Sequence, residues 1–206
     1  MVSAEEGLAL EPEEMIICSS SYEFPEMPLS QISLCSFKGA TLKASDMRTC
    51  LLMLSEDCRL RDLTLHCALV NTVVVVRTGS LHAVNCQLSD DSNSCQSDFA
   101  QGIIAMSGTK ILIENCSFEN FYSGIVVHKG AKVELRNCTI RKCGVGIQIY
   151  SGSEVMLNGT TISECSEQSV RCEVDRTAGR DFSSVKELQI MANCRIGSGD
   201  FKKEIL

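Results

Sequence analysis

The sequence repeats one pattern three times, as GIIAMSGTKILIENCSFENFYS (residues 102–123), GIVVHKGAKVELRNCTIRKCGV (124–145) and GIQIYSGSEVMLNGTTISECSE (146–167). Each copy opens on a glycine and runs for 22 residues. A fixed period of this length indicates a solenoid, in which each unit contacts only its neighbours and stacking builds a shared core.

Within one copy, apolar residues occupy every second position in three short runs. In the second copy these residues are Ile125 and Val127, then Val133 and Leu135, then Cys138 and Ile140. Alternation of period two indicates strands. The apolar set changes from odd to even numbers across Asn137, so one residue is absorbed in a bend, and Asn tolerates the left-handed conformation that such a bend requires. We therefore expect an all-β fold, a right-handed parallel β-helix of three-strand coils.

The main alternative at the level of the fold is a leucine-rich repeat, whose period is similar. Its leucine-dense consensus is absent from the three copies. Helical repeats are disfavoured because their apolar residues recur at spacings of three and four, not two.

Aligning the flanking sequence on ENCSF and RNCTI extends the register to about seven coils. The inward file then contains Cys35, Leu63, Cys86, Cys116, Cys138, Thr160 and Cys194. The file one step before it contains Leu34, Asp62, Asn85, Asn115, Asn137, Gly159 and Asn193. We expect the five cysteines to be buried thiols, and Asn85, Asn115, Asn137 and Asn193 to form a structural ladder along the bend.

The 13 cysteines do not suggest a disulfide scaffold. Their number is odd, no signal peptide precedes them, and many fall on inward strand positions, so reduced thiols are expected. No C-x-x-C pair is present, and a zinc site needs such local pairs of ligands. The sequence therefore predicts neither a metal nor another cofactor.

Composition divides the chain into three parts. Residues 1–31 carry seven acidic side chains and no Lys or Arg, and are expected to be a flexible or capping segment. Residues 32–196 are expected to form the β-helix, and residues 197–206 a polar tail. The N-terminus lacks the pattern of a signal peptide, which favours the cytoplasm or nucleus.

The net charge is −7 and no basic cluster is present. This argues against nucleic acid, whose phosphates are bound by Lys and Arg, and no stretch has the character of a membrane-binding segment. The expected partners are other proteins.

Two insertions interrupt the 22-residue period. Eight extra residues lie within residues 89–101, where we expect a protruding candidate protein-binding loop that carries Asp90, Asp91, Asp98 and Phe99. A second insertion lies at residues 175–184. Insertions in solenoids often bind partners, although an insertion can also be merely tolerated.

A carbohydrate-active β-helix enzyme would carry clustered carboxylates and cations on one sheet. The outward residues of the first strand in the three copies are instead apolar or neutral, namely Ile104, Met106, Val126, His128, Gln148 and Tyr150. We therefore expect no catalytic residues and no enzyme.

The stretch ENCSFENFYSGIVVHKGAKVELRNCTIRKCGVGIQI (114–149) resembles the Shc SH2-domain-binding protein family. The same units also resemble β-helix repeats of F-box proteins that recognise substrates for ubiquitination, but no F-box helices precede them. The resemblance implies a non-enzymatic scaffold on the spindle or cytoskeleton, acting in cell division or spermatogenesis. It also implies spindle or microtubule-associated factors as partners, with a chaperone or a signalling adaptor as further candidates.

Overall fold

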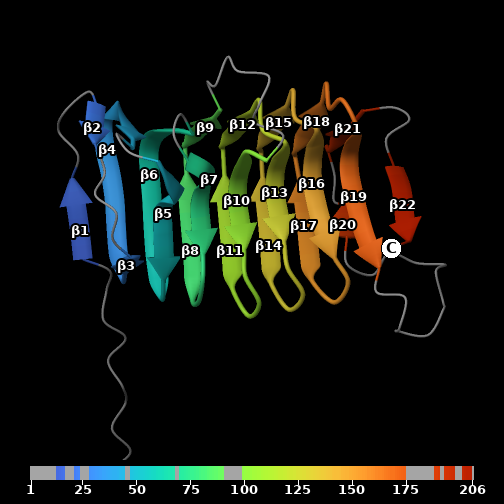
Figure 1. Ribbon diagram of the computed structural model, residues 1–206, viewed down its shortest axis with the longest axis horizontal. Coiled ribbons are helices and arrows are strands. Elements are labelled where there is room, and N and C mark those ends of the chain that lie inside the picture. The colour runs from blue at the N-terminus through green and yellow to red at the C-terminus, as the bar shows by residue number, and fades with distance from the viewer. Residues whose placement is uncertain are drawn as a thin grey trace, which may run out of the picture.

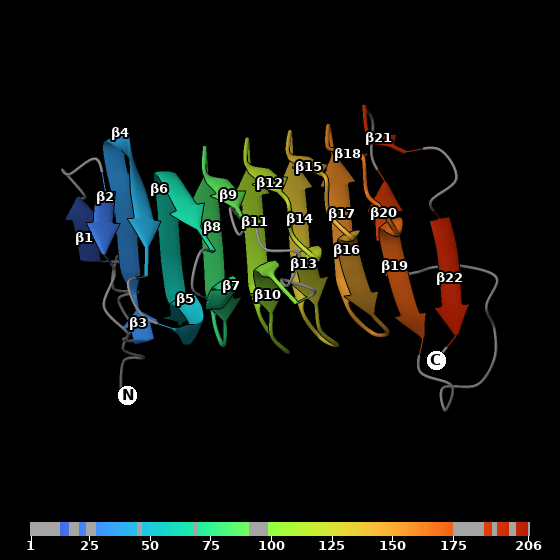
Figure 2. The ribbon, with the colours of Figure 1, turned by 45° about the horizontal axis from the view of Figure 1, so that its top comes forward.

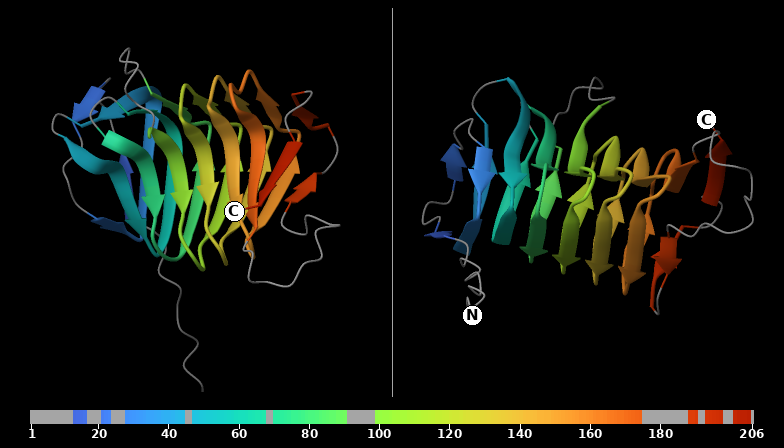
Figure 3. Two further views of the ribbon diagram at one scale, coloured as in Figure 1. Left: turned by 45° about the vertical axis from the view of Figure 1, so that its right-hand side comes forward. Right: turned by 90° about the horizontal axis from the view of Figure 1, so that it is seen from below.

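The chain forms a parallel β-helix of about six turns with a period of about 23 residues (Figure 1). The computed structural model describes residues 13–16, 21–23, 28–44, 47–67, 70–90, 99–174, 188–190, 193–197 and 201–205. Every strand pair in this part of the chain is parallel. The predicted fold class is confirmed, with one turn fewer than expected. Figures 2 and 3 show from other sides how the coils stack along one axis.

The strands of each coil belong to two sheets, one of which bends. The eight-stranded sheet contains β3 (Pro28–Ser30), β5 (Arg48–Ser55), β7 (Val70–Val76), β10 (Gln101–Ala105), β13 (Ser123–Val127), β16 (Val145–Tyr150), β19 (Gln168–Val174) and β22 (Phe201–Ile205). The other sheet has 14 strands in two arms, which are joined by β4 (Ile32–Lys43) and β6 (Asp57–His66).

The long arm contains β8 (Ser80–Val84), β11 (Lys110–Glu114), β14 (Lys132–Arg136), β17 (Glu154–Asn158) and β20 (Leu188–Ile190). The short arm contains β9 (Gln87–Ser89), β12 (Ser117–Glu119), β15 (Thr139–Arg141), β18 (Thr161–Ser163) and β21 (Arg195–Ile196). At the N-terminal end, β1 (Glu13–Ile16) and β2 (Ser21–Glu23) both pair with β4.

The core consists of rows in which equivalent residues of successive coils stack on one another. Ile103, Ile125 and Ile147 form one row of the eight-stranded sheet and are almost completely buried. In β14 the buried residues Val133 and Leu135 alternate with Lys132, Glu134 and Arg136. The alternation in the sequence therefore follows the inside and outside of the coil.

The bend between the two arms is formed by residues in the left-handed region. Asp62, Asn85, Asn115, Asn137, Gly159 and Asn193 all have φ between 53° and 64°. The backbone N–H groups of Asn85, Asn115 and Asn137 donate to carbonyls of the next coil, as where Asn115 N–H donates to the carbonyl of Arg136 at 2.9 Å. Asn137 thus has the left-handed conformation that the sequence predicted for this bend.

The inward file next to this bend differs from the expectation at its first member. Ala40, not Cys35, pairs with Leu63, because the register of β4 shifts between Cys35 and Ala40. Cys35 instead pairs with Arg61. It is buried nevertheless, and its thiol donates to the Glu14 carboxylate of β1 at 3.4 Å. Ala40 takes its place at the start of the file, 23 residues before Leu63, and is fully buried.

The remaining cysteines of the file follow the repeat. Cys86, Cys116 and Cys138 are each 1–2% exposed and occupy equivalent positions on successive coils. Cys194 is only partly buried, so the expectation of a buried thiol is wrong there. It belongs to the last described turn of the short arm, where no further coil pairs with β21 among the described residues.

Both ends of the chain add strands to the helix. Within residues 1–31, β1 and β2 extend the bent sheet and β3 pairs with β5. The expected polar tail is also partly a strand, because β22 pairs with β19 and places Phe201 and Ile205 opposite Val170 and Val174. The segment is polar in composition, so the sequence did not indicate a strand, although Phe201 and Ile205 are at the even spacing that a strand requires.

Candidate protein-binding face

The candidate binding loop is only partly supported by where its residues lie. Asp90 is 4% exposed, and its backbone N–H donates to the carbonyl of Glu119 at 3.2 Å. It therefore continues the pairing of the short arm and is not a protruding residue. Phe99 is 72% exposed. Asp91 and Asp98 lie outside the described residues, as does the second insertion at residues 175–184.

A row of apolar residues crosses the outer face of the eight-stranded sheet. Met53, Val75, Ile104 and Val126 occupy the same position on β5, β7, β10 and β13. Met106, which follows β10, is 39% exposed, and we call these five residues the apolar strip. Met53, Val75 and Ile104 are half-buried, whereas Val126 is outward by register but only 3% exposed.

Polar and aromatic side chains continue this face beyond the strip. The rings of His128 and Tyr150 stack with their centroids 5.0 Å apart and their planes 7° from parallel. The Gln148 amide donates to the Tyr150 hydroxyl at 3.1 Å and to Glu173 at 2.5 Å. Burial and the nearby Glu173 raise the pKa of Tyr150, so this hydroxyl stays protonated near neutral pH.

The charge on the middle of this face has one sign. The strands and turns at residues 70–79, 99–109 and 121–131 contain no Asp or Glu, and their charged side chains are Arg77 and Lys129. Both are exposed. Arg77 also lies over the strip, with Nη1 at 3.8 Å from the Met53 sulfur. The centre of the face is therefore apolar with a cationic border, in a chain whose net charge is −7.

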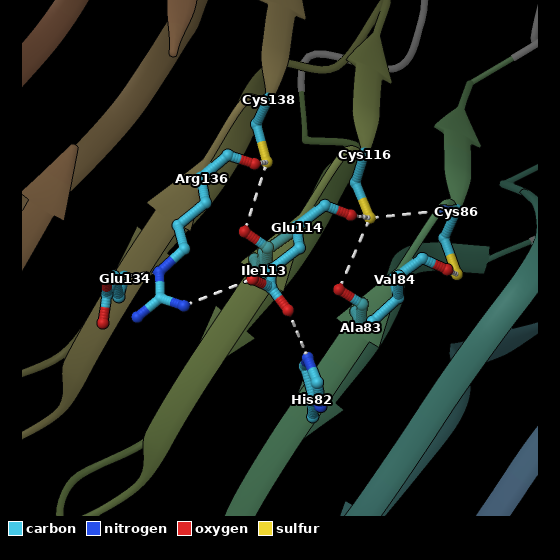
Figure 4. A network of polar contacts seen from close by, with 10 residues as sticks. All are labelled: His82, Ala83, Val84, Cys86, Ile113, Glu114, Cys116, Glu134, Arg136 and Cys138. Atoms are coloured by element: carbon cyan, nitrogen blue, oxygen red, sulfur yellow. Dashed lines mark hydrogen bonds and ion pairs between the residues drawn. The ribbon is translucent and has the colours of Figure 1, made fainter. Parts of the chain in front are cut away.

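The outer face of the long arm has the opposite character, because its charged side chains pair with one another. Glu114 accepts from His82 Nε2 at 2.7 Å and from Arg136 Nη1 at 3.3 Å (Figure 4). Arg136 also binds Glu134 at 2.7 Å. The hydrogen bond from His82, and after it the contact with Arg136, lower the pKa of the Glu114 carboxyl. One coil further, Lys132 pairs with Glu154 at 2.9 Å.

The short arm is also polar on its outer face. Glu119 binds Lys142 at 2.8 Å and Arg141 at 2.7 Å, and both contacts lower the pKa of the Glu119 carboxyl. His66 lies 2.9 Å from the Ser89 hydroxyl of the next coil. The sequence did not indicate Ser89 as a partner of His66, because the two residues are 23 positions apart and only the stacking of coils brings them together.

Among the described residues, no group of three or more His, Cys, Asp or Glu side chains is arranged to hold a metal ion. The three histidines belong to different coils, and His82 and His66 lie on different arms of the bent sheet. The described part of the chain contains no helix that is long and apolar enough to cross a membrane.

The sequence contained the strip residues but did not identify them as a site. The sequence pattern places Ile104, Met106 and Val126 on the outside of the coil, where their apolar character argues against the charged face of an enzyme. The useful signal was the excess of apolar residues at outward positions in VVVVR, GIIAM and GIVVH. An outward apolar row over several coils is unusual for a solvated face.

A family model described as the right-handed β-helix region matches residues 71–199, which is more than half of the 206 residues. The chain belongs to the right-handed β-helix family. Comparison with curated proteins and with solved structures gives no match. Membership of this family accounts for the fold of the chain.

Proposed function

We propose that this right-handed β-helix is a non-enzymatic protein-interaction scaffold that binds its partner on the outer face of the eight-stranded sheet. The apolar strip carries the proposal. It joins four consecutive coils, whereas the charged residues of the long arm are already paired within the molecule. An apolar row gains free energy when a partner removes it from water, and paired surface charges offer little by comparison.

The resemblance of residues 114–149 to Shc SH2-domain-binding proteins supports a finer proposal. The partner is then a spindle or microtubule-associated protein, and the scaffold acts in cell division. This finer proposal is tested separately, by following the tagged chain through mitosis. An even distribution at every stage would contradict it without affecting the strip.

The strip is tested by affinity capture from dividing cells with three forms of the protein. Ile104→Glu places a charge in the strip, and Leu112→Glu is the matched control because Leu112 is a half-buried outward residue of β11 in the same coil. We expect wild type and Leu112→Glu to retain the same proteins, and Ile104→Glu to retain at least tenfold less. Equal capture by all three would refute the proposal. Met106→Glu, at the most exposed strip position, serves if Ile104→Glu has an altered melting curve.

A further inference from the structure

The spacing and charge of the apolar strip limit the kind of partner that fits it. The strip runs along the axis of the solenoid, since its members come from consecutive strands. Strands in a sheet are about 4.8 Å apart, so Met53 and Val126, three steps apart, are separated by about 14 Å along the axis. A partner that contacts every member must present an apolar group about every 4.8 Å.

An α-helix meets this condition better than an extended strand. One helical turn rises about 5.4 Å, so residues at i, i+3 or i+4, i+7 and i+11 advance about 16 Å over three turns. Side chains on one face of an extended strand are spaced about 6.7 Å apart, which gives about 20 Å over three intervals. Over three intervals the apolar groups of the helix therefore depart from the spacing of the strip by about 2 Å, whereas those of the strand depart from it by more than one strand spacing of about 4.8 Å.

The border of the strip selects the charge of the helix. Arg77 and Lys129 follow the ends of β7 and β13 and so lie along one edge of the strip. Residues 70–79, 99–109 and 121–131 contain no carboxylate, and Glu56 lies at the Met53 end of this edge, where its N–H donates to the Thr78 hydroxyl at 3.4 Å. Acidic side chains beside the apolar stripe of the helix would meet these cations, and basic side chains would meet repulsion. The selection is local, because the net charge of the whole chain is −7 and disfavours acidic partners at long range.

We infer that the apolar strip binds an acidic amphipathic helix of a partner protein, laid along the solenoid axis. The helix presents apolar residues once per turn to the half-buried Met53, Val75 and Ile104, and carboxylates to Arg77 and Lys129. This inference rests on the proposed function and specifies its partner.

The test is selection from an unbiased display library of 16-residue peptides on immobilised wild-type protein, with removal of peptides that also bind Ile104→Glu. We expect enriched peptides with apolar residues at i, i+3 or i+4 and i+7, and with Asp or Glu beside them. The strongest peptide should bind Leu112→Glu as it binds wild type, bind Ile104→Glu at least tenfold more weakly, and become helical on binding by circular dichroism. Its affinity for Arg77→Glu should also fall, and raising the salt concentration should weaken its binding to wild type.

Three results would overturn the inference. Enriched peptides with period-two alternation or with basic flanks would assign the strip to another ligand, and no enrichment would remove the peptide site altogether. Sedimentation showing a wild-type dimer that Ile104→Glu dissociates would assign the strip to a second copy of this chain. These failures are distinguishable from failure of the proposed function, because the capture experiment compares whole proteins and does not depend on the conformation of the bound segment.

Discussion

At the scale of single residues, the inward file of cysteines has a polar as well as an apolar role. The Cys138 thiol donates to the carbonyl of Arg136 at 3.3 Å and to that of Ile113, one coil earlier, at 3.4 Å (Figure 4). Cys116 repeats these contacts with Glu114 and Ala83. Thr160 makes both with its hydroxyl, to Asn158 and Leu135 at 3.3 Å each. From Cys86 to Thr160 the position therefore holds a small side chain that donates a hydrogen bond, whereas Leu63 fills it in the preceding coil without a donor.

Substitution of Cys138 separates size from hydrogen bonding. Cys138→Thr keeps a donor, as in the neighbouring coil, and should change the free energy of unfolding by less than about 1 kcal/mol. Cys138→Val has nearly the same shape but leaves two carbonyls without this donor, and should cost about 1–2 kcal/mol. Urea denaturation of the two variants measures the difference. Equal stability would show that the thiol serves only as a packed apolar group.

Burial of the thiols also predicts how stability depends on pH. It raises the pKa of Cys138 to about 11 and the pKa of Cys67 and Cys143 to about 12, from an ordinary value near 9. Above pH 9 the unfolded chain loses these protons before the folded chain does. The stabilisation is therefore complete below pH 9, and is lost as the pH rises towards 11–12, by about 1.4 kcal/mol per pH unit for each thiol.

The measurement is the free energy of unfolding from pH 8 to 11, with Cys138→Thr as the control. Cys138→Thr removes one thiol whose pKa is raised. The free energy of unfolding should then fall less steeply with pH, by the contribution of one proton, whereas the titration of Tyr and Lys is common to both proteins. Identical slopes would contradict the assignment.

At the scale of elements, the glycine that opens each copy is explained by close approach of neighbouring coils. A Cβ atom on Gly124 would lie 2.7 Å from the Gly146 carbonyl oxygen and 3.0 Å from Ile140 Cγ2. Gly108 is different, since it lies in a turn with φ +82° and a Cβ there would meet nothing within 4 Å. The two glycines are thus needed for separate reasons, one for space and one for backbone conformation.

Alanine substitution should distinguish the two glycines. Gly124→Ala forces two coils apart and should cost about 1–3 kcal/mol, as overpacking does. Gly108→Ala should cost about 1 kcal/mol, the penalty of a left-handed alanine in open space. Thermal melting of both variants tests this order. If Gly108→Ala were the more damaging, strain in the turn and not contact between coils would dominate.

At the scale of the whole molecule, coils of unequal length share one stack because each coil contacts only its neighbours. Two residues connect Asn120 to Ser123, whereas ten connect the equivalent residues Asp90 and Gln101. Asp90 and Gln101 nevertheless keep the pairing of the repeat at both ends of the insertion. A solenoid tolerates such insertions without change to its core.

Deletion of residues 91–98 restores the two-residue connection and should change the free energy of unfolding by about 1 kcal/mol or less. Partner capture should be retained, because the strip lies on the sheet. Phe121→Ala, which removes a ring that is 2% exposed, is the comparison and should cost about 3–5 kcal/mol. Deletion that unfolds the chain as badly as Phe121→Ala would show a wrong register at this corner. Deletion that abolishes capture would return the binding site to the loop.

The sequence by itself determined the period, the three strands of each coil, the bend at Asn115 and Asn137, and the inward rows. These features are local, since alternation decides which side chains face inward, and Asn or Gly marks where the backbone must turn. The register of Cys35, the burial of Asp90 and the strand in the supposed tail were decided only by the tertiary structure, because each depends on pairing with a neighbouring coil. The same is true of the binding face. The sequence shows outward apolar residues, but His82 and Arg136 are 32 and 22 positions from Glu114, and only the stacking of coils shows that they pair with it on the long arm.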